Sequence, residues 1–332
     1  MACEPNQLIN QSTISMYNSF ISIVGVIHHP RELELLPEYL SNLHPVLTEH
    51  FSDFEVVLVN NNLSIPVAPF IEPLPDALKQ NIFLLNLSRT TNKNHAVLAG
   101  LDRANGDYTV IFEFEFYQQP NLALQLFEKT REHFDIVYLR AKGRQVGFRF
   151  QPLYKLFYSI LRHYSNLQID EMAHNTRIIS RRALNSLLRL RENLRYMKAI
   201  YSIVGYKTAF LETDMPLKPD INESFSDRFR TSLVAITSFT TFLRSLLLWI
   251  FIFSVVFLLG VIVNALKVKF TGIDLFGNIG EPFSGWTFLV ILIAVFFATT
   301  CLNLYVMSIY LSNIYNEIKQ RPSYIIESIQ RF

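Results

Sequence analysis

The chain has 332 residues, half of them hydrophobic, and a formal net charge of only +2. This length exceeds one small domain, and the apolar content predicts a sizeable core together with a further apolar part. The nearly neutral charge gives no sign of nucleic acid binding. The two cysteines, Cys3 and Cys301, exclude a disulfide framework and a zinc site, because one is near a terminus and the other lies in a long apolar run.

Residues 1–19 read as an N-terminal extension. The stretch lacks the basic region, apolar core and cleavage site of a secretion signal. We therefore expect the region that follows to stay on the cytoplasmic side.

Short apolar runs rich in β-branched residues alternate with helical patterns between residues 20 and 140. The predicted strands are residues 20–27, 54–60, 82–88, 108–114 and 134–140. The predicted helices are residues 32–50, 73–80, 94–105 and 121–133. Continuous apolar strands separated by helices are typical of parallel strands buried on both faces. The pattern predicts an α/β fold with an open, mostly parallel sheet.

Polar residues follow the predicted strands, where open α/β sheets bind their ligands. They are His28 and His29, Asn60, Asn61 and Asn62, Ser88 and Arg89, and Glu113 and Glu115. The sequence therefore predicts a binding site at this edge of the sheet.

The segment after the alternating region is mixed, with predicted helices at 181–190 and 193–204 and a strand at 206–213. Residues 148–167 are aromatic and amphipathic, which is compatible with a helix in the membrane interface or with one packed on the sheet. A second such stretch, 227–244, leads directly into a long apolar run and is expected to lie along the membrane surface.

Two uncharged runs near the C-terminal end, 245–266 and 286–310, are each long enough to cross a bilayer, which needs roughly 20 residues. They predict a transmembrane two-helix hairpin. Arg and Lys residues precede the first run and follow the second, so both termini are expected in the cytoplasm. Small and hydroxylated residues within 294–308 allow close helix approach in lipid, which predicts a homo-oligomer.

These residues resemble a known family, the membrane-bound family 2 glycosyltransferases of the dolichol-phosphate-mannose-synthase-like group, which load a sugar onto polyprenyl phosphate. The resemblance is clearest in LSRTTNKNHAVLAGLDRANGDYTVIFE and IYNEIKQRPSYII and covers nearly the whole chain. It implies a GT-A-like nucleotide-sugar-binding domain at 20–215, a juxtamembrane amphipathic segment at 216–244, two transmembrane helices at 245–312 and a cytoplasmic tail at 313–332. It also implies an inner or plasma membrane location.

The resemblance assigns roles to acidic positions that this chain has changed. Glu113 and Glu115 stand where paired aspartates of the family meet the sugar donor's diphosphate and its Mg²⁺ or Mn²⁺. Asn61 and Asn62 stand where carboxylates of the family contact the nucleoside. The acid proposed as catalytic base falls on Gln118, which cannot take a proton at neutral pH.

Basic residues of the family pattern are partly kept. The resemblance places Arg89 and Lys93 at the nucleotide. It places Arg177, the only residue kept from the family's Gly-Asp-Phe-Arg, at the lipid phosphate with Arg195 and Lys198.

The sequence leaves two functions open. One is an active polyprenyl-phosphate glycosyltransferase for cell-surface glycan assembly, because a phosphate acceptor is largely deprotonated at pH 7 and needs a strong base less than a hydroxyl does. The other is a catalytically inactive, membrane-anchored pseudo-glycosyltransferase that binds a partner or regulates one. In that case Glu113 and Glu115 are the outward side of a strand end, and the asparagines form a turn.

Overall fold

The computed structural model describes residues 16–61, 65–145, 151–165, 169–190, 197–217, 232–271 without 234 and 238, 273, 285–319 and 322–332. The chain divides into two compact units. The first, here called the sheet unit, comprises Met1–Gly147, Asp170–Asp220 and Pro322–Phe332. The second, here called the hairpin unit, comprises Phe148–Ile169 and Ile221–Arg321.

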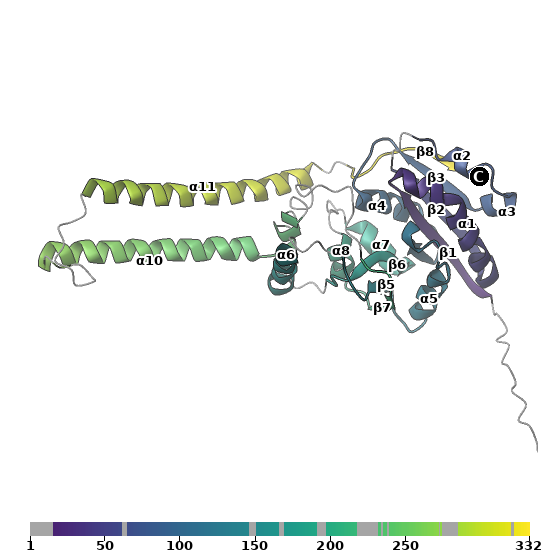
Figure 1. The fold of residues 1–332 in the computed structure, drawn as a ribbon, viewed down its shortest axis with the longest axis horizontal. Helices are drawn as coiled ribbons and strands as arrows, with labels where there is room; N and C mark the ends of the chain where they lie inside the picture. The colour runs from purple at the N-terminus through teal and green to yellow at the C-terminus, as the bar shows by residue number, and fades with distance from the viewer. Residues whose placement is uncertain are drawn as a thin grey trace, which may run out of the picture. The chain divides into compact units, whose positions relative to one another are not determined.

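The described part of the sheet unit contains one eight-stranded sheet in the order β7-β5-β6-β4-β1-β2-β3-β8 (Figure 1). The strands are β1 (Tyr17–Ile27), β2 (Phe51–Asn60), β3 (Ile82–Leu87), β4 (Tyr108–Ile111), β5 (Ile136–Ala141), β6 (Ala173–Ser180), β7 (Thr208–Thr213) and β8 (Ile326–Arg331). The pairs β1/β2, β1/β4, β2/β3 and β5/β7 are parallel, whereas β6 and β8 run antiparallel to their neighbours. The predicted mostly parallel sheet is confirmed, although β6 and β8 were not predicted.

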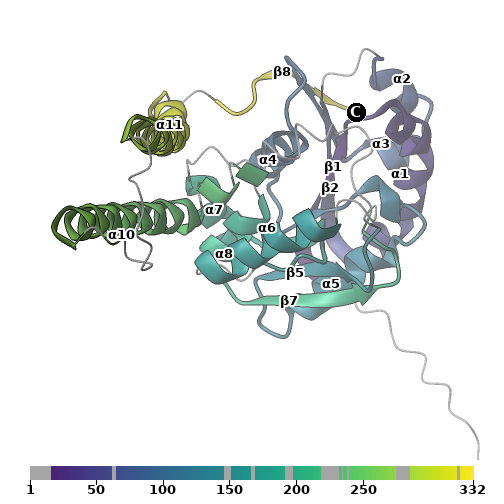
Figure 2. The same ribbon diagram turned by 60° about the vertical axis from the view of Figure 1, so that its left-hand side comes forward.

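Helices cover both faces of the sheet. The described helices of the sheet unit are α1 (Pro30–His50), α2 (Ala68–Ile71), α3 (Asp76–Lys79), α4 (Lys93–Arg103), α5 (Asn121–Thr130), α7 (Arg181–Arg189) and α8 (Met197–Ile203). Figure 2 shows α1 on one side of β1 and β2 and α4 on the other. Along β1, Ile23 packs into the core with α1 and α5, while Val24 packs into the core with α4 and α7. This burial on both faces explains why the strands read as continuous apolar runs.

The site edge of the sheet is set by strand register and by one glycine. Ile27 at the end of β1 pairs with Asn60 at the end of β2, so the segments that follow both strands begin at the same edge. A Cβ at Gly100 would lie 2.4 Å from Val24 and 3.0 Å from Val59. Gly100 therefore lets α4 pack closely on the sheet, which fixes the position of Lys93 at its N-terminal end.

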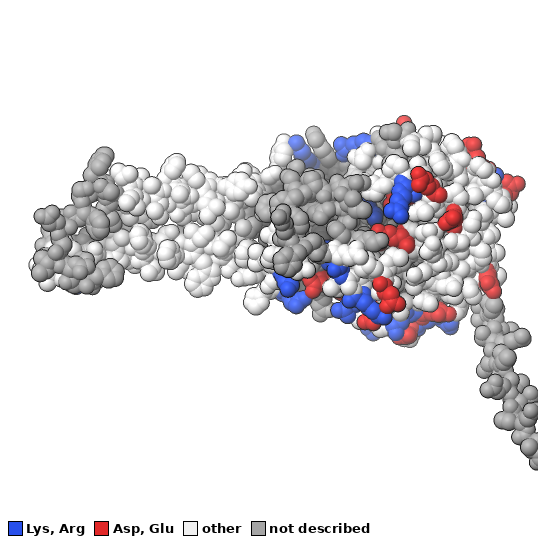
Figure 3. All heavy atoms as spheres, viewed as in Figure 1, with Lys and Arg blue, Asp and Glu red and all other residues white. Residues whose placement is uncertain are grey.

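The hairpin unit contains α6 (Gln151–Tyr164), α10 (Phe242–Thr271) and α11 (Gly285–Ile318). Two spans, Phe242–Val268 and Leu289–Ser312, have mean hydropathies of 3.1 and 2.3 and are long and apolar enough to cross a membrane. In Figure 3 the described atoms of α10 and α11 are almost entirely white, whereas charged residues are frequent on the sheet unit. The expected apolar helices are present, and their crossing of a membrane stays a prediction.

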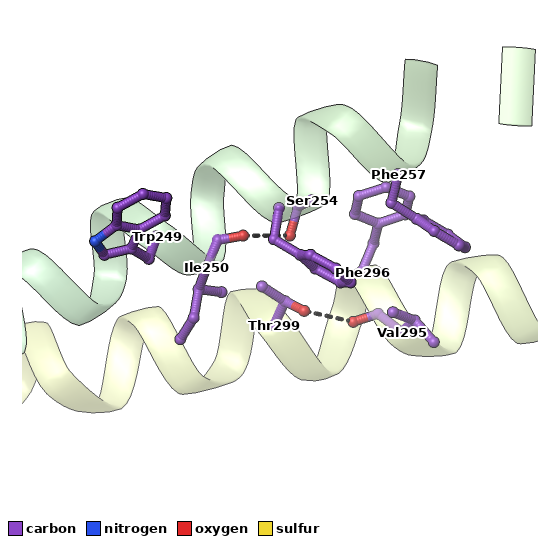
Figure 4. Close-up of a pocket in the computed structure, with 8 residues that line it drawn as sticks. Trp249, Ile250, Ser254, Phe257, Val295, Phe296 and Thr299 are labelled. Carbon is purple, nitrogen blue, oxygen red and sulfur yellow. Dashed lines mark hydrogen bonds between the residues drawn. The ribbon is translucent and has the colours of Figure 1, made fainter. Parts of the chain in front are cut away.

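The two long helices lie side by side and enclose a groove of about 290 Å³ (Figure 4). Its two hydroxyl groups donate within their own helices, Ser254 to the carbonyl of Ile250 and Thr299 to that of Val295. The groove is therefore lined almost entirely by apolar atoms.

Helix α6 belongs to the hairpin unit. The amide of Thr241 donates to the carbonyl of Tyr164, and the ring of Tyr164 lies 5.1 Å from that of Phe242 at the start of α10. Leu153 and Leu156 on α6 are exposed. Its position in the membrane interface stays a prediction. Most of the predicted segment 216–244 lies outside the described residues, and the predicted tail 313–332 ends in β8.

Candidate functional site

The stretch FEFEF follows β4 and presents two glutamates. It was predicted as strand up to residue 114, but β4 ends at Ile111 and a 3₁₀ turn spans Phe114–Phe116. All three phenylalanines of the stretch are buried, while Glu115 is exposed. Tyr39 of α1 stacks on Phe114, with ring centroids 4.3 Å apart, and donates a hydrogen bond to the Phe112 carbonyl at 2.9 Å. The aromatic side chains thus anchor the turn that carries the glutamates.

The carboxylate of Glu113 is held by three donors. Lys93 Nζ and Asn175 Nδ2 each lie 3.0 Å from its Oε1, and the Asn175 amide donates to Oε2 at 3.2 Å. Burial raises the pKa of Glu113, but the Lys93 charge and the Asn175 hydrogen bond outweigh it and bring the pKa to about 2. With a side chain only 13% exposed, Glu113 is a nearly buried carboxylate that is ionised at neutral pH.

A small cavity of about 40 Å³ opens beside this pair. We call it the acidic cavity, and its polar lining residues are Glu32, Lys93, Glu113, Glu115 and Asn175. The Glu32 carboxylate accepts hydrogen bonds from the backbone amides that precede α1. Three carboxylates against one ammonium give this lining an excess of negative charge, which favours a cation when an anionic ligand enters.

The donor set fits a metal shared between protein and ligand. In the described part of the chain, no group of three or more His, Cys, Asp or Glu side chains is arranged to hold a metal ion. Mg²⁺ usually keeps one or two protein carboxylates and takes its other ligands from substrate phosphates and water. Glu115 is the exposed carboxylate of the cavity and suits that role by its accessibility, and the Glu113 carboxylate lies 3.0 Å from Lys93 Nζ.

A second polar cluster lies after β1 and β2. Asn61 is 1% exposed, and its side chain makes four hydrogen bonds. Nδ2 lies 2.8 Å from the Thr91 carbonyl and 2.6 Å from His28 Nδ1, while Oδ1 accepts from the amide and the hydroxyl of Thr91. We call Asn61, Thr91 and His28 the amide brace. It ties the loop before α4 to the end of β1 and uses the full hydrogen-bonding capacity of the Asn61 side chain.

The other predicted site residues that the structure describes belong to neither cluster. Arg89 is exposed and lies in the loop that Thr91 fixes, while Asn62 lies outside the described residues. Gln118 is exposed, donates to the Tyr117 hydroxyl at 2.9 Å, and is not among the described residues that line the acidic cavity. Its predicted place at the reaction centre stays a prediction.

The predicted lipid-phosphate residues do not form one described cluster. Arg177 is buried, donates to the carbonyls of His174 and Asn175 at 2.7 and 3.1 Å, and burial lowers its pKa. Arg195 lies outside the described residues, and Lys198 lies on α8, with its side chain outside them. Binding of lipid phosphate at these positions stays a prediction.

Three residues of the site were missed by the sequence reasoning: Glu32, Thr91 and Asn175. Two of them left a signal. Glu32 follows His29 at the spacing of a capping box. Asn175 stands at the aspartate of the family's Gly-Asp-Phe-Arg, and Glu113, one methylene longer than aspartate, stands at another aspartate of the family. Thr91 left none, because its contact with Asn61 depends on how the loop folds.

No protein-family model matches the chain. Among curated proteins, it is 27% identical to an uncharacterized glycosyltransferase of Synechocystis over 93% of this chain and 96% of the relative. It is 24% identical to the uncharacterized glycosyltransferase YkcC of Bacillus subtilis, over 88% and 89%. It is 26% identical to the bactoprenol glucosyl transferase of Shigella phage SfII, over 90% and 96%. The chain is thus similar to glycosyltransferases along nearly its whole length.

Solved structures of glycosyltransferases resemble part of this chain, with low TM-scores and low sequence identity. One is the mannosyltransferase PcManGT from Pyrobaculum calidifontis in complex with GDP-Man and Mn²⁺, with 14% identity and a TM-score of 0.41 over 66% of this chain and 61% of that one. Another is glucosyl-3-phosphoglycerate synthase from Mycobacterium tuberculosis in complex with Mn²⁺ and UDP-glucose, with 14% identity and a TM-score of 0.43 over 66% and 77%.

Proposed function

We propose that this chain transfers a sugar from a nucleotide sugar to a polyprenyl phosphate at the cytoplasmic face of a membrane, for cell-surface glycan assembly. The observation that carries the proposal is the acidic cavity, where ionised Glu113, Lys93 and exposed Glu115 meet at the end of β4. The similarity to proteins named bactoprenol glucosyl transferase supports a polyprenyl acceptor. The two long apolar helices support a membrane location.

The residues of the acidic cavity suit a diphosphate. Lys93 is a cation kept in place by Glu113, and its side chain is still 32% exposed to a ligand. Glu115 offers hard oxygen atoms for Mg²⁺ or Mn²⁺, which would neutralise charge on the leaving diphosphate. In this proposal Glu113 orients Lys93, Glu115 binds the cation, and the loop with Arg89 lies toward the nucleoside.

The acceptor reduces the need for a base. The second pKa of a phosphate monoester is about 6, so its oxygen is largely deprotonated at neutral pH. Gln118 therefore need not remove a proton for transfer to proceed. In this proposal the positively charged side chains of Arg195 and Lys198 bind the lipid phosphate.

An inactive pseudo-glycosyltransferase is the second candidate, and the amide brace favours it. The Asn61 side chain already makes four internal hydrogen bonds, where the family resemblance places a carboxylate for the nucleoside. A chain that had lost donor binding could keep such a brace for stability alone.

Calorimetric titration of the full-length protein in detergent distinguishes the two. UDP-glucose, UDP-N-acetylglucosamine and GDP-mannose would each be titrated with Mn²⁺ and with EDTA, followed by transfer of the radiolabelled sugar to undecaprenyl phosphate. We expect one donor to bind in the presence of Mn²⁺ and to label the lipid. Binding of none of them would contradict the transferase and support a partner-binding role.

A further inference from the structure

Arg177 is a buried cation that the proposed chemistry does not use. It lies on β6, pairs in register with Ile111 at the end of β4, and its side chain is almost completely buried. A buried arginine is costly unless its donors are used, so its partners indicate what it does.

The hydrogen-bonding edge of Arg177 faces the backbone of His174 and of Asn175, the second of which also holds Glu113. Its terminal nitrogen donates to the His174 carbonyl, and its Nε donates to the Asn175 carbonyl. Asn175 in turn gives its backbone amide and its side-chain amide to the Glu113 carboxylate. Arg177 thus fixes the backbone of the residue that orients Glu113, and through Glu113 it also orients Lys93.

The flat face of Arg177 contacts α8. Its guanidinium carbon lies 3.8 Å from the centroid of the Tyr201 ring, and Tyr201 is itself buried. Tyr201 follows Lys198 by one helical turn on α8. A continuous set of contacts therefore runs from α8, which carries Lys198, through Arg177 and Asn175 to Glu113.

We propose that Arg177 is a positioning residue that couples α8 to Glu113 and thereby sets how tightly the acidic cavity binds the donor diphosphate. This inference rests on the proposed function. Arginine suits the role, because its planar fork can bind two carbonyl groups while its face stacks on an aromatic ring. Lysine keeps the charge but has neither the fork nor the flat face.

The test is a double-mutant cycle on the full-length protein, with the three nucleotide sugars named above titrated in Mn²⁺. We expect Arg177→Lys and Asn175→Ala each to weaken donor binding about tenfold, or about 1.4 kcal/mol. The double variant should bind no more weakly than the worse single variant, because both changes act through the same contact with Glu113.

Arg181→Lys is the matched control. Arg181 also donates to a backbone carbonyl, that of Ala104 at 2.9 Å, but it lies at the opposite end of β4 from Glu113. We expect this variant to lose some thermal stability and to keep the wild-type donor affinity. An Arg177→Lys protein that behaves in the same way would overturn the inference.

A further variant tests the contact between Arg177 and α8 without changing Arg177. If Arg177→Lys does not fold, Tyr201→Leu removes only the aromatic platform and is expected to weaken donor binding about threefold, or about 0.6 kcal/mol. Unchanged affinity in a folded Tyr201→Leu protein, or strictly additive losses in the cycle, would overturn the coupling. Absence of donor binding in the wild type would instead overturn the proposed function, and the inference with it.

Discussion

The amide brace and the acidic cavity lie at the same edge of the sheet but differ in how far their polar side chains are exposed. In the brace, Asn61 is 1% exposed, and its amide is fully engaged with Thr91 and His28. In the cavity, Glu115 is exposed, and the Lys93 side chain is 32% exposed. The brace is therefore buried inside the protein, whereas the cavity exposes charged side chains that a ligand can reach.

This difference follows from two kinds of substitution. Where the family resemblance expects aspartate and the chain has asparagine, the new side chain supplies donors, and these are taken up by neighbouring protein groups. Where the chain has glutamate, the carboxylate remains and only its reach changes. We therefore expect donor binding to depend more on the diphosphate side of the site than on the nucleoside side.

The largest effect is expected from the ionisation of Glu113. Its pKa is about 2 instead of the usual 4.5, because Lys93 and Asn175 outweigh the effect of burial. The stabilisation is fully present above pH 4.5 and is lost as the pH falls from 4.5 toward 2. A difference of this size corresponds to roughly 3 to 4 kcal/mol as an upper limit.

Thermal unfolding between about pH 6 and pH 3 measures this effect, because the Glu113→Gln variant should lose less stability than wild type over that range. Equal slopes would mean that the Lys93 and Asn175 contacts do not favour the ionised form.

Lys93→Met should have the next largest effect. It leaves the nearly buried Glu113 carboxylate without its cation, and we expect a loss of about 2 kcal/mol in the free energy of unfolding, less than for a fully buried pair. Denaturant unfolding checks this value. Adding Glu113→Gln to Lys93→Met should recover most of the loss, because no uncompensated charge remains, and no recovery would contradict the pairing.

Asn61→Asp tests the brace. An aspartate has no side-chain donor, so the Thr91 carbonyl and His28 Nδ1 lose their partner in a buried place, at a cost of about 1 to 2 kcal/mol. Asn42→Asp is the control, since the exposed Asn42 also donates to a backbone carbonyl. Its change in the unfolding midpoint should be much smaller. A similar loss in both variants would show that burial of the brace does not matter.

Much of the sheet and the location of both polar clusters could be predicted from the sequence. The alternation of apolar strands and helices predicted the sheet. The polar residues that follow the strands predicted where both clusters lie. Both predictions succeed because they depend only on patterns over short stretches of sequence. The strand β8 could not be predicted, because its IESIQR residues are mostly exposed and pair with β3 from the far end of the chain. The burial of Arg177 could not be predicted either, because it depends on β6 and α8 meeting in space.

Glu115→Gln tests the open side of the cavity. The change keeps the size of the side chain and removes its charge, so Mn²⁺-dependent nucleotide-sugar binding should fall at least about tenfold if Glu115 is a metal ligand. Thermal stability without metal should stay the same or rise, because one of several clustered carboxylates is neutralised. Titration with and without Mn²⁺ measures the first quantity and thermal unfolding the second. No change in either would favour an exposed carboxylate of the 3₁₀ turn with no role in metal binding.

Gln118→Ala is expected to have the smallest effect and separates binding from chemistry. Gln118 is exposed and donates to the neighbouring Tyr117 hydroxyl, so stability should change by no more than about 0.5 kcal/mol. An amide cannot accept a proton at neutral pH, and a phosphate acceptor is already ionised, so the rate of sugar transfer should fall less than about tenfold. Single-turnover transfer, with exposed Gln119→Ala as the control, measures that rate. A much larger fall in this rate with intact donor binding would mean that Gln118 orients the acceptor directly. The site of the reaction would then include residues outside the acidic cavity.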